Sequence, residues 1–345
     1  MKLSDFDYNL PKELIAQHPT AEREKCRLMV LDRAKRTIEH KTFEDIGDYL
    51  NKDDLLVLNN TKVIPARLFG KRKTGGKVEL FVLDASTELS INPERSRRVE
   101  KKNPICEALV RPSGRLKEGE LITLESGAKA EVLGRGQLGR FVKFDSPIDE
   151  ILKSGHVPLP PYIGRQDEES DIDDYQTVYA AKEGATASPT AGLHFTKELL
   201  LNLKCRVSYV TLHTSYGTFA PVKTEEVEKH KMHKESFSIP AETVEAVKSA
   251  KKSGGKVFAV GTTSARSLEY WAKEDKVEGD NDLFVYPGFE FKVVDRLITN
   301  FHLPKSTLML LVSAFAGREF ILEAYRKAVE EKYRFFSYGD SMLIV

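Results

Sequence analysis

A loop with the composition of a binding site lies in the middle of the chain. Residues 185–196 read Ala-Thr-Ala-Ser-Pro-Thr-Ala-Gly-Leu-His-Phe-Thr and show neither helical nor strand periodicity. The following segment predicts a helix capped by Thr196, so His194 would precede a helix N-terminus, where free N–H groups favour anions. Histidine also suits proton transfer near neutral pH. The same residues would equally suit a tight connection shaped by Gly192, so both interpretations stand.

Polar residues also follow four of the expected strands, at Asn59, His213, Gly261 and Asn300. Strand ends at one edge of a sheet would converge on a single cleft. Residues 261–264, Gly-Thr-Thr-Ser, open an expected helix and form a cradle suited to a carboxylate or phosphate. Ordinary helix capping would look similar, so the cradle is a hypothesis.

Other kinds of chemistry find less support in the sequence. His230 and His233 have a spacing that a metal could use, with His213 as a third ligand, but no cysteine pair or glutamate-containing zinc helix accompanies them. The sequence has no iron–sulfur cysteine motif and no Gly-x-Ser-x-Gly nucleophile elbow. We therefore predict no metal site.

A dinucleotide-binding pattern, Gly-Arg-Gly-Gln-Leu-Gly, occupies residues 134–139. That motif requires a helix after it, because the pyrophosphate lies on the helix N-terminus. A strand is expected here instead, so we interpret the pattern as a hairpin turn.

Length and composition indicate a globular protein with room for two domains. Of the 345 residues, 41% are hydrophobic and 30% are charged. No apolar run is long enough to cross a bilayer, and the acidic N-terminus lacks the apolar core of a signal peptide. Three widely spaced cysteines indicate a reducing compartment. We expect a cytoplasmic protein without membrane contact.

Two parts of the chain predict different architectures. Residues 1–65 and 147–345 predict alternating helices and strands, including a short helix over 10–18, and hence an α/β (α+β) catalytic domain. Residues 66–146 predict closely spaced strands, which favour an inserted antiparallel β-barrel. A stiff proline-rich connector, residues 157–163, follows the insert.

Basic residues concentrate in and around the predicted barrel. Residues 62–117 contain 14 Lys and Arg and 6 Asp and Glu, a net charge of +8 (14 − 6), whereas the whole chain carries +1. Such an excess suits a phosphate-backbone surface, although a solvated charged surface is the commoner meaning of a charge run.

Eight sequence blocks resemble the S-adenosylmethionine:tRNA ribosyltransferase-isomerases of queuosine biosynthesis. They run in order through nearly the whole chain, at residues 55–68, 158–163, 175–180, 189–195 (Pro-Thr-Ala-Gly-Leu-His-Phe), 261–266, 286–288, 299–307 (Thr-Asn-Phe-His-Leu-Pro-Lys-Ser-Thr) and 333–340. The sequence departs from the expected family pattern at Asn60 (Asp expected), at Ser188 (Ala expected) and at 213–217, where His-Thr-Ser-Tyr-Gly replaces His-Val-Gly-Ala-Gly.

The resemblance implies a reaction. The ribosyl group of S-adenosylmethionine is transferred to 7-aminomethyl-7-deazaguanine at the wobble position of tRNA and isomerised to epoxyqueuosine, and adenine and methionine are released. S-adenosylmethionine would be a co-substrate, and no cofactor would be bound permanently. The chemistry requires a base beside the sulfonium, an acid for the departing adenine and a seat for the methionine carboxylate.

The assignment of these roles to residues is our own hypothesis. We expect His194 and His302 to be the acid and base, with Asn300 as a third catalytic residue. Thr262 and Thr263 would seat the carboxylate, Arg266 and Lys305 would be charge partners, and Phe195 or Tyr216 would face adenine or the sulfonium. The expected substrate contacts are Thr190, Gly192, Phe195, His213, Tyr216, Gly261, Thr262, Thr263, Arg266, Lys305, Asn59 and Thr61.

The basic insert becomes the expected tRNA surface, with the protein acting as a monomer. Its expected tRNA contacts are Arg67, Lys71, Arg72, Lys73, Arg97, Arg98, Arg111 and Arg115. Two alternatives remain from other classes, a tRNA-binding protein that has lost catalysis and a metal-dependent hydrolase. The histidine-rich blocks argue against a pure binding protein.

Overall fold

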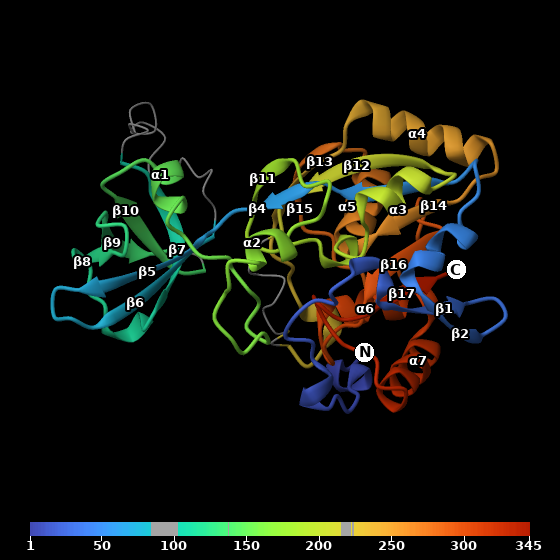
Figure 1. Cartoon of the computed structure of the whole chain (residues 1–345), viewed down its shortest axis with the longest axis horizontal. Coiled ribbons are helices and arrows are strands. Elements are labelled where there is room, and N and C mark those ends of the chain that lie inside the picture. The colour runs from blue at the N-terminus through green and yellow to red at the C-terminus, as the bar shows by residue number, and fades with distance from the viewer. Residues whose placement is uncertain (84–102, 137, 215–221, 223) are drawn as a thin grey trace.

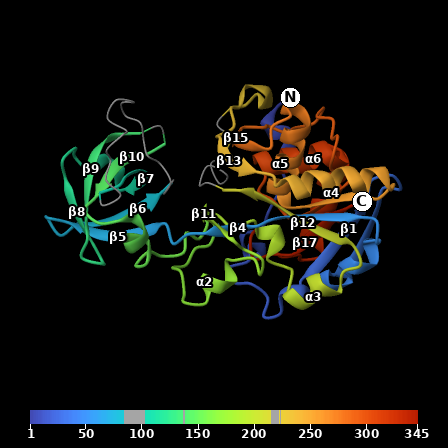
Figure 2. The same cartoon turned by 90° about the horizontal axis from the view of Figure 1, so that it is seen from above.

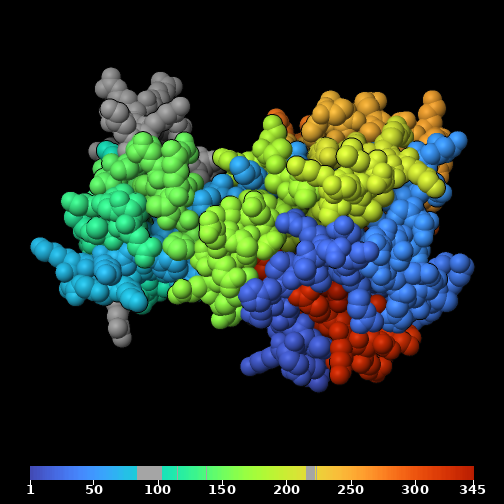
Figure 3. Space-filling view, viewed as in Figure 1, coloured from blue at the N-terminus to red at the C-terminus, as the bar shows by residue number. Residues whose placement is uncertain are grey.

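The computed structural model describes residues 1–83, 103–136, 138–214, 222 and 224–345. It consists of a large body built on a mixed sheet and a smaller barrel beside it (Figure 1). Residues in the middle of the chain, coloured green, fill the space between the two (Figure 3). None of the described helices has the length and apolar character needed to cross a membrane.

The sheet of the body has the strand order β15-β13-β12-β3-β14-β16-β17-β1-β2. Its strands are β1 (Arg27–Asp32), β2 (Thr37–Thr42), β3 (Leu55–Asn59), β12 (Arg206–Leu212), β13 (Glu235–Ser238), β14 (Val257–Val260), β15 (Glu278–Asn281), β16 (Arg296–Asn300) and β17 (Ser341–Ile344). The central strands β12, β3, β14 and β16 are parallel, so their carboxyl ends share one edge. The outer pairs β12–β13, β13–β15, β16–β17 and β1–β2 are antiparallel.

Both faces of this sheet are covered, which explains the continuous apolar sequence of β3. Leu55 and Val57 enter one hydrophobic core, whereas Leu56 and Leu58 enter the core on the other face, as the two-residue period of a strand requires. Helices α4 (Ala241–Lys252), α5 (Gly261–Glu274), α6 (Thr307–Ala316) and α7 (Arg318–Glu330) contribute to the first core. Helix α3 (Lys197–Asn202) packs on the opposite face (Figure 2).

The inserted antiparallel barrel is confirmed. It closes in the order β10-β7-β6-β5-β8-β9, from strands β5 (Arg67–Arg72), β6 (Lys77–Val82), β7 (Ile105–Arg111), β8 (Leu121–Leu124), β9 (Lys129–Arg135) and β10 (Arg140–Phe144). Strands β9 and β10 pair antiparallel around residues 134–139, and the N–H of Gly136 donates to the Gly139 carbonyl over 2.9 Å. The dinucleotide-like pattern is therefore a hairpin turn. The domain boundaries at 65/66 and 146/147 stay predictions.

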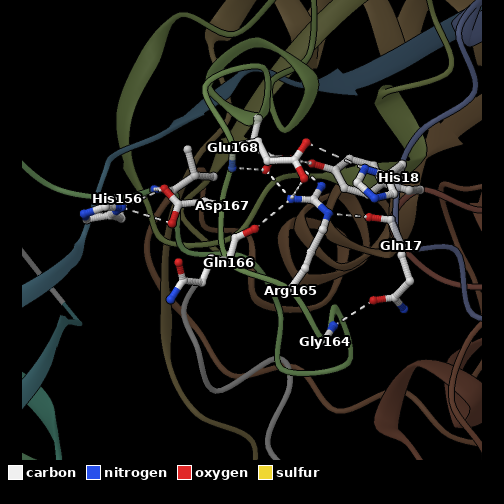
Figure 4. Close-up of polar contacts among 11 residues, drawn as sticks. Gln17, His18, His156, Gly164, Arg165, Gln166, Asp167 and Glu168 are labelled. Carbon is white, nitrogen blue, oxygen red and sulfur yellow. Dashed lines mark hydrogen bonds and ion pairs between the residues drawn. The ribbon is translucent and has the colours of Figure 1, made fainter.

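The chain that leaves the barrel is fastened to both parts of the molecule. It contains α1 (Ile148–Leu152) and α2 (Asp171–Asp174), and it precedes β11 (Lys182–Ala185), which pairs with β4 (Thr61–Val63). His156 exchanges backbone hydrogen bonds with Arg67 of β5, and its Nδ1 lies 3.0 Å from the Asp167 carboxylate (Figure 4). Arg165 donates twice to the buried Asp171, at 2.6 and 2.8 Å, and once to the Gln17 carbonyl.

One predicted element is wrong. The helix expected over residues 10–18 is reduced to a single 3₁₀ turn, Lys12–Leu14. The reason is tertiary: the Leu14 carbonyl accepts from Phe335 N–H over 2.8 Å, and Ala16 N–H donates to the Phe335 carbonyl over 3.2 Å. These backbone groups would otherwise pair within a helix.

Candidate active site

The carboxyl ends of β14 and β16 open into a cavity of about 330 Å³. Its walls come from the central loop (residues 187–191), the start of α5 (261–263), the segment 299–306 that joins β16 to α6, and residues 336 and 337 of the C-terminal loop. Leu3 and Tyr162 also line it, so the structure brings together residues from near both ends of the chain.

Seven of the predicted site residues line this cavity: Asn300, His302, Thr190, Gly261, Thr262, Thr263 and Lys305. The prediction that strand ends converge therefore holds for β14 and β16. Gly261 has φ of +84°, a backbone conformation that side chains other than glycine resist, and it turns the chain sharply from β14 into α5. This turn presents the first N–H groups of α5 near the cavity, where they lack partners within the helix.

Asn59, Thr61 and His213 at the other two strand ends do not line the cavity, although Thr214, which follows His213 after β12, does. The Asn59 amide donates to the Leu212 carbonyl over 3.0 Å, and its oxygen accepts from the N–H groups of Leu212 and Thr61. The Thr61 hydroxyl lies 2.8 Å from His213 Nδ1. These residues join the end of β3 to the end of β12, so the expectation that Asn59, Thr61 and His213 contact the substrate does not fit their placement.

Three further predicted contacts belong to the packed interior, outside the cavity lining. The Phe195 ring is fully buried and meets Phe43 edge to face at 4.9 Å, so it is a core residue. A Cβ on Gly192 would lie 1.9 Å from the Tyr179 hydroxyl, which explains the glycine by close packing. Arg266 points into the body, where its guanidinium donates to the Glu235 carboxylate and to the Leu283 carbonyl. Tyr216 lies outside the described residues.

His194 is buried behind the cavity wall and takes no part in lining it. Its Nε2 lies 3.1 Å from Asn300 Oδ1, and its Nδ1 lies 3.1 Å from Cys26 Sγ. The Asn300 amide nitrogen donates to the carbonyls of Phe336 and Ser337, so its oxygen faces His194. The network therefore assigns the proton to His194 Nε2 and leaves Nδ1 to accept from the Cys26 thiol.

Burial sets the charge states of the His194 imidazole and the Cys26 thiol. Desolvation lowers the pKa of His194 to about 4, despite the hydrogen bond with Asn300, which raises it. Burial also raises the pKa of the Cys26 thiol well above its usual value. At neutral pH, His194 is thus a neutral ring with both nitrogens engaged, an arrangement that orients neighbours better than it moves protons.

His302 lines the cavity, and burial lowers its pKa to about 3. Its Nε2 lies 2.8 Å from the Thr299 hydroxyl, and the backbone on either side of the ring is held by Tyr325 and Tyr8. Among the residues that the structure describes, none forms a hydrogen bond with His302 Nδ1. A neutral imidazole with a ring nitrogen available beside a cavity can accept a proton.

Unsatisfied hydroxyl groups also mark the cavity wall. Ser188, Thr214 and Thr263 all line the cavity, and none of their buried hydroxyl oxygens has a hydrogen-bond partner in the described part of the chain. Buried polar groups in proteins are almost always paired, so three such hydroxyls around one cavity indicate a place for a polar ligand. Ser188 is also one of the positions where the sequence departs from the family pattern.

The sequence did not identify Tyr162 and Phe336 as site residues, yet both line the cavity, with their rings stacked at 4.4 Å. Both lie within the family-like blocks 158–163 and 333–340, which was the available signal. No periodicity or strand-end pattern could have located them, because they reach the cavity from the connector and from the loop before β17.

The predicted tRNA contacts differ in their surroundings. Lys71, Lys73 and Arg111 are exposed on the barrel. Arg67 and Arg72 are less exposed and form ion pairs with Glu79 and Glu120, at 2.9 and 2.5 Å. The other predicted contacts, Arg97, Arg98 and the side chain of Arg115, lie outside the described part of the structure.

The described residues contain no group of three or more His, Cys, Asp or Glu side chains placed to hold a metal ion. His230 instead packs its ring against Phe284 at 5.2 Å. The three-histidine arrangement considered from the sequence is therefore not assembled among these residues.

Comparison with known proteins matches this chain to one family over nearly its whole length. A family described as "Queuosine biosynthesis protein" matches residues 3–344. The chain is 55% identical to the S-adenosylmethionine:tRNA ribosyltransferase-isomerase of Sulfurihydrogenibium sp. and 51% identical to that of Aquifex aeolicus, in each case over the full length of both chains. It resembles the crystal structure of S-adenosylmethionine tRNA ribosyltransferase from Thermotoga maritima, with 38% identity, a TM-score of 0.55 and coverage of 99% of this chain and 100% of that one. The chain therefore belongs to the queuosine biosynthesis protein family.

Proposed function

We propose that this protein is an S-adenosylmethionine:tRNA ribosyltransferase-isomerase. It transfers the ribosyl group of S-adenosylmethionine to 7-aminomethyl-7-deazaguanine at the wobble position of tRNA and isomerises it to epoxyqueuosine, with release of adenine and methionine. The observation that carries the proposal is full-length identity of 55% to a relative of that name, together with a cavity assembled from the sequence blocks that carry the resemblance. S-adenosylmethionine acts as a co-substrate, and a tRNA substrate is consistent with a cytoplasmic enzyme.

The start of α5 is our proposed seat for the methionine carboxylate. Thr262 and Thr263 line the cavity in the first turn of that helix, where backbone N–H groups and the helix dipole favour an anion. The unpartnered hydroxyls of Ser188, Thr214 and Thr263 supply further polar contacts. Lys305 lines the same cavity, although its ammonium group lies 2.8 Å from the Asp7 carboxylate and is partly neutralised by it.

His302 is our proposed base. It is neutral in the free protein, so it can accept the proton that leaves the carbon beside the sulfonium. A pKa of about 3 makes it a weak base in the free protein, and in the complex the ligand's carboxylate would raise that pKa whereas its sulfonium would lower it. We no longer propose His194 as the acid, because both of its ring nitrogens are engaged behind the wall.

The barrel is our proposed tRNA-binding surface. Lys71, Lys73 and Arg111 are exposed and suited to phosphate contacts. Arg67 and Arg72 have carboxylate partners that an RNA phosphate would have to displace. Tight binding of tRNA should therefore weaken as the salt concentration rises.

The test is release of free adenine by purified, metal-stripped protein. The protein is incubated with S-adenosylmethionine and tRNA bearing 7-aminomethyl-7-deazaguanine, and the control reaction contains the same tRNA with unmodified guanine. We expect adenine only with the modified tRNA. No adenine with both tRNAs still bound would overturn the enzyme proposal in favour of a tRNA-binding protein, and activity only after zinc is restored would favour a metal-dependent enzyme.

A further inference from the structure

Phe336 has an unusual backbone conformation at the cavity wall. Its φ is +70°, in the left-handed region that bulky residues rarely occupy. Gly261 and Lys305 also have positive φ, of +84° and +55°, and line the same cavity. Non-glycine residues in this region are strained and concentrate at functional sites, where the surrounding structure holds them in place.

The contacts that hold Phe336 come from several segments of the chain. Its N–H donates to the Phe301 carbonyl over 3.2 Å. Its own carbonyl accepts from the Asn300 amide over 2.8 Å and from the N–H of Gly339 over 2.9 Å. Asn300 is oriented in turn by His194, and His194 by Cys26. A buried chain of hydrogen bonds therefore runs from the core to the backbone of a strained residue.

The strained backbone places the Phe336 ring against Tyr162, with the ring centroids 4.4 Å apart and the planes inclined by 25°. The Tyr162 hydroxyl lies 2.6 Å from the Ser337 hydroxyl, which fixes the pair further. Phe301 also lines the cavity, but its buried ring packs against Tyr333 and Phe335 in the core. Phe336 belongs to the same core cluster and Tyr162 packs against it, but Phe336 is 6% exposed and Tyr162 is half-buried, whereas Phe301 is fully buried. Within the described part of the lining, Tyr162 and Phe336 are thus the Tyr and Phe side chains that keep exposed surface.

We infer that Phe336 is a binding residue for the adenine ring of S-adenosylmethionine, which it contacts by stacking, and that Asn300 and His194 are positioning residues for it. The inference rests on the proposed function. Adenine is the flat, aromatic part of that molecule, and rings stack favourably with an offset. The hydroxyl-rich part of the wall and the start of α5 suit the charged aminocarboxylate instead. This assignment replaces Phe195 as an expected adenine contact.

Ligand-binding calorimetry on Phe336→Leu tests the stacking contact. The leucine keeps an apolar side chain with the same backbone strain but removes the aromatic face. The ligands are S-adenosylmethionine and 5′-methylthioadenosine, which has the adenine ring without the sulfonium charge and the aminocarboxylate. We expect both Kd values to rise about tenfold, since the stacking contact with the base is lost. Phe336→Tyr keeps the face and should bind both ligands nearly as the wild type does.

The control is Phe291→Leu, which removes a half-buried ring outside the cavity and should change neither Kd. If Phe336→Leu weakens S-adenosylmethionine alone, the ring faces the sulfonium and the inference is wrong. Unchanged affinity for both ligands would also overturn it. Failure of the wild type to bind S-adenosylmethionine at all would instead overturn the proposed function, so the two failures can be told apart.

Steady-state kinetics on His194→Ala and His194→Gln test the positioning role. A glutamine amide can donate to Asn300 Oδ1 as His194 Nε2 does, whereas alanine cannot. We expect His194→Ala to raise KM for S-adenosylmethionine and the Kd of 5′-methylthioadenosine by the same factor as Phe336→Leu, and His194→Gln to restore both. A fall in kcat with unchanged KM in both variants would mean that His194 transfers a proton, which would refute the positioning role.

Discussion

Replacement of Thr263 by valine should have opposite effects on the free protein and on its complex. The Thr263 hydroxyl is buried without a partner in the described part of the chain, and the residue is 8% exposed. A buried, unpaired polar group costs about 1–3 kcal/mol relative to a paired one. Valine has the same shape and a similar helix propensity, so Thr263→Val should stabilise the free protein by up to that amount.

The same change should weaken S-adenosylmethionine binding. A hydrogen bond to a charged group contributes about 1.5–3 kcal/mol, so loss of a contact with the methionine carboxylate would raise Kd by roughly 10- to 150-fold. Calorimetric unfolding without ligand gives the first effect as a rise in Tm of a few degrees, and isothermal titration gives the second.

Ser264→Ala is the matched control. The Ser264 hydroxyl is also buried and unpartnered, on the next residue of α5, but Ser264 is not part of the cavity lining. It should raise Tm in the free protein and leave the Kd unchanged. If Thr263→Val lowered Tm, or bound S-adenosylmethionine as tightly as the wild type, the reasoning about the carboxylate seat would be refuted.

Three further outcomes are expected. Burial lowers the pKa of His302 from 6.5 to about 3, so the unfolded chain protonates first. The free energy of unfolding should therefore be intact above pH 6.5 and fall by about 1.4 kcal/mol per pH unit for this group between pH 6.5 and about 3. Calorimetry of His302→Gln should show a shallower acid slope, and an equal slope would contradict this account. In titrations at several salt concentrations, Lys71→Glu should weaken tRNA binding and reduce its salt dependence by roughly one phosphate contact. Lys252→Glu on α4 should change neither the affinity nor the salt dependence. Equal effects of the two substitutions on tRNA binding would count against the barrel surface. Asp171→Asn should destabilise the protein by about 3–5 kcal/mol in denaturant unfolding, because it leaves the Arg165 guanidinium without its bidentate carboxylate, and a loss below about 1 kcal/mol would contradict this.

Local patterns predicted those elements whose formation depends on neighbouring residues. The Thr196 hydroxyl accepts from Leu199 N–H over 3.1 Å and caps α3, as the sequence indicated. The glycine turn at 261 and the helix after it were also recognisable. A positive φ favours glycine, and the first turn of this helix is rich in Thr and Ser. The barrel strands followed from their spacing and turns.

Long-range pairing decided what local patterns could not. Leu14 and Ala16 have the composition of a helix, but their backbone groups pair with Phe335, which is more than 300 residues away in the sequence. The sequence cannot show whether an aromatic residue in a loop, such as Phe195, faces a cavity or the core. In the structure, Phe195 packs against Phe43 in the core.

The sequence by itself determined the family, the two kinds of architecture and the strand ends that could hold a site, because these follow from residue order, period and turn chemistry. Only the tertiary structure decided which strand ends share a cavity, that His194 lies behind its wall and that Phe336 forms part of it. These outcomes depend on side-chain direction and on contacts between distant segments. The spacing of residues along the chain gives neither the direction of a side chain nor the contacts between distant segments.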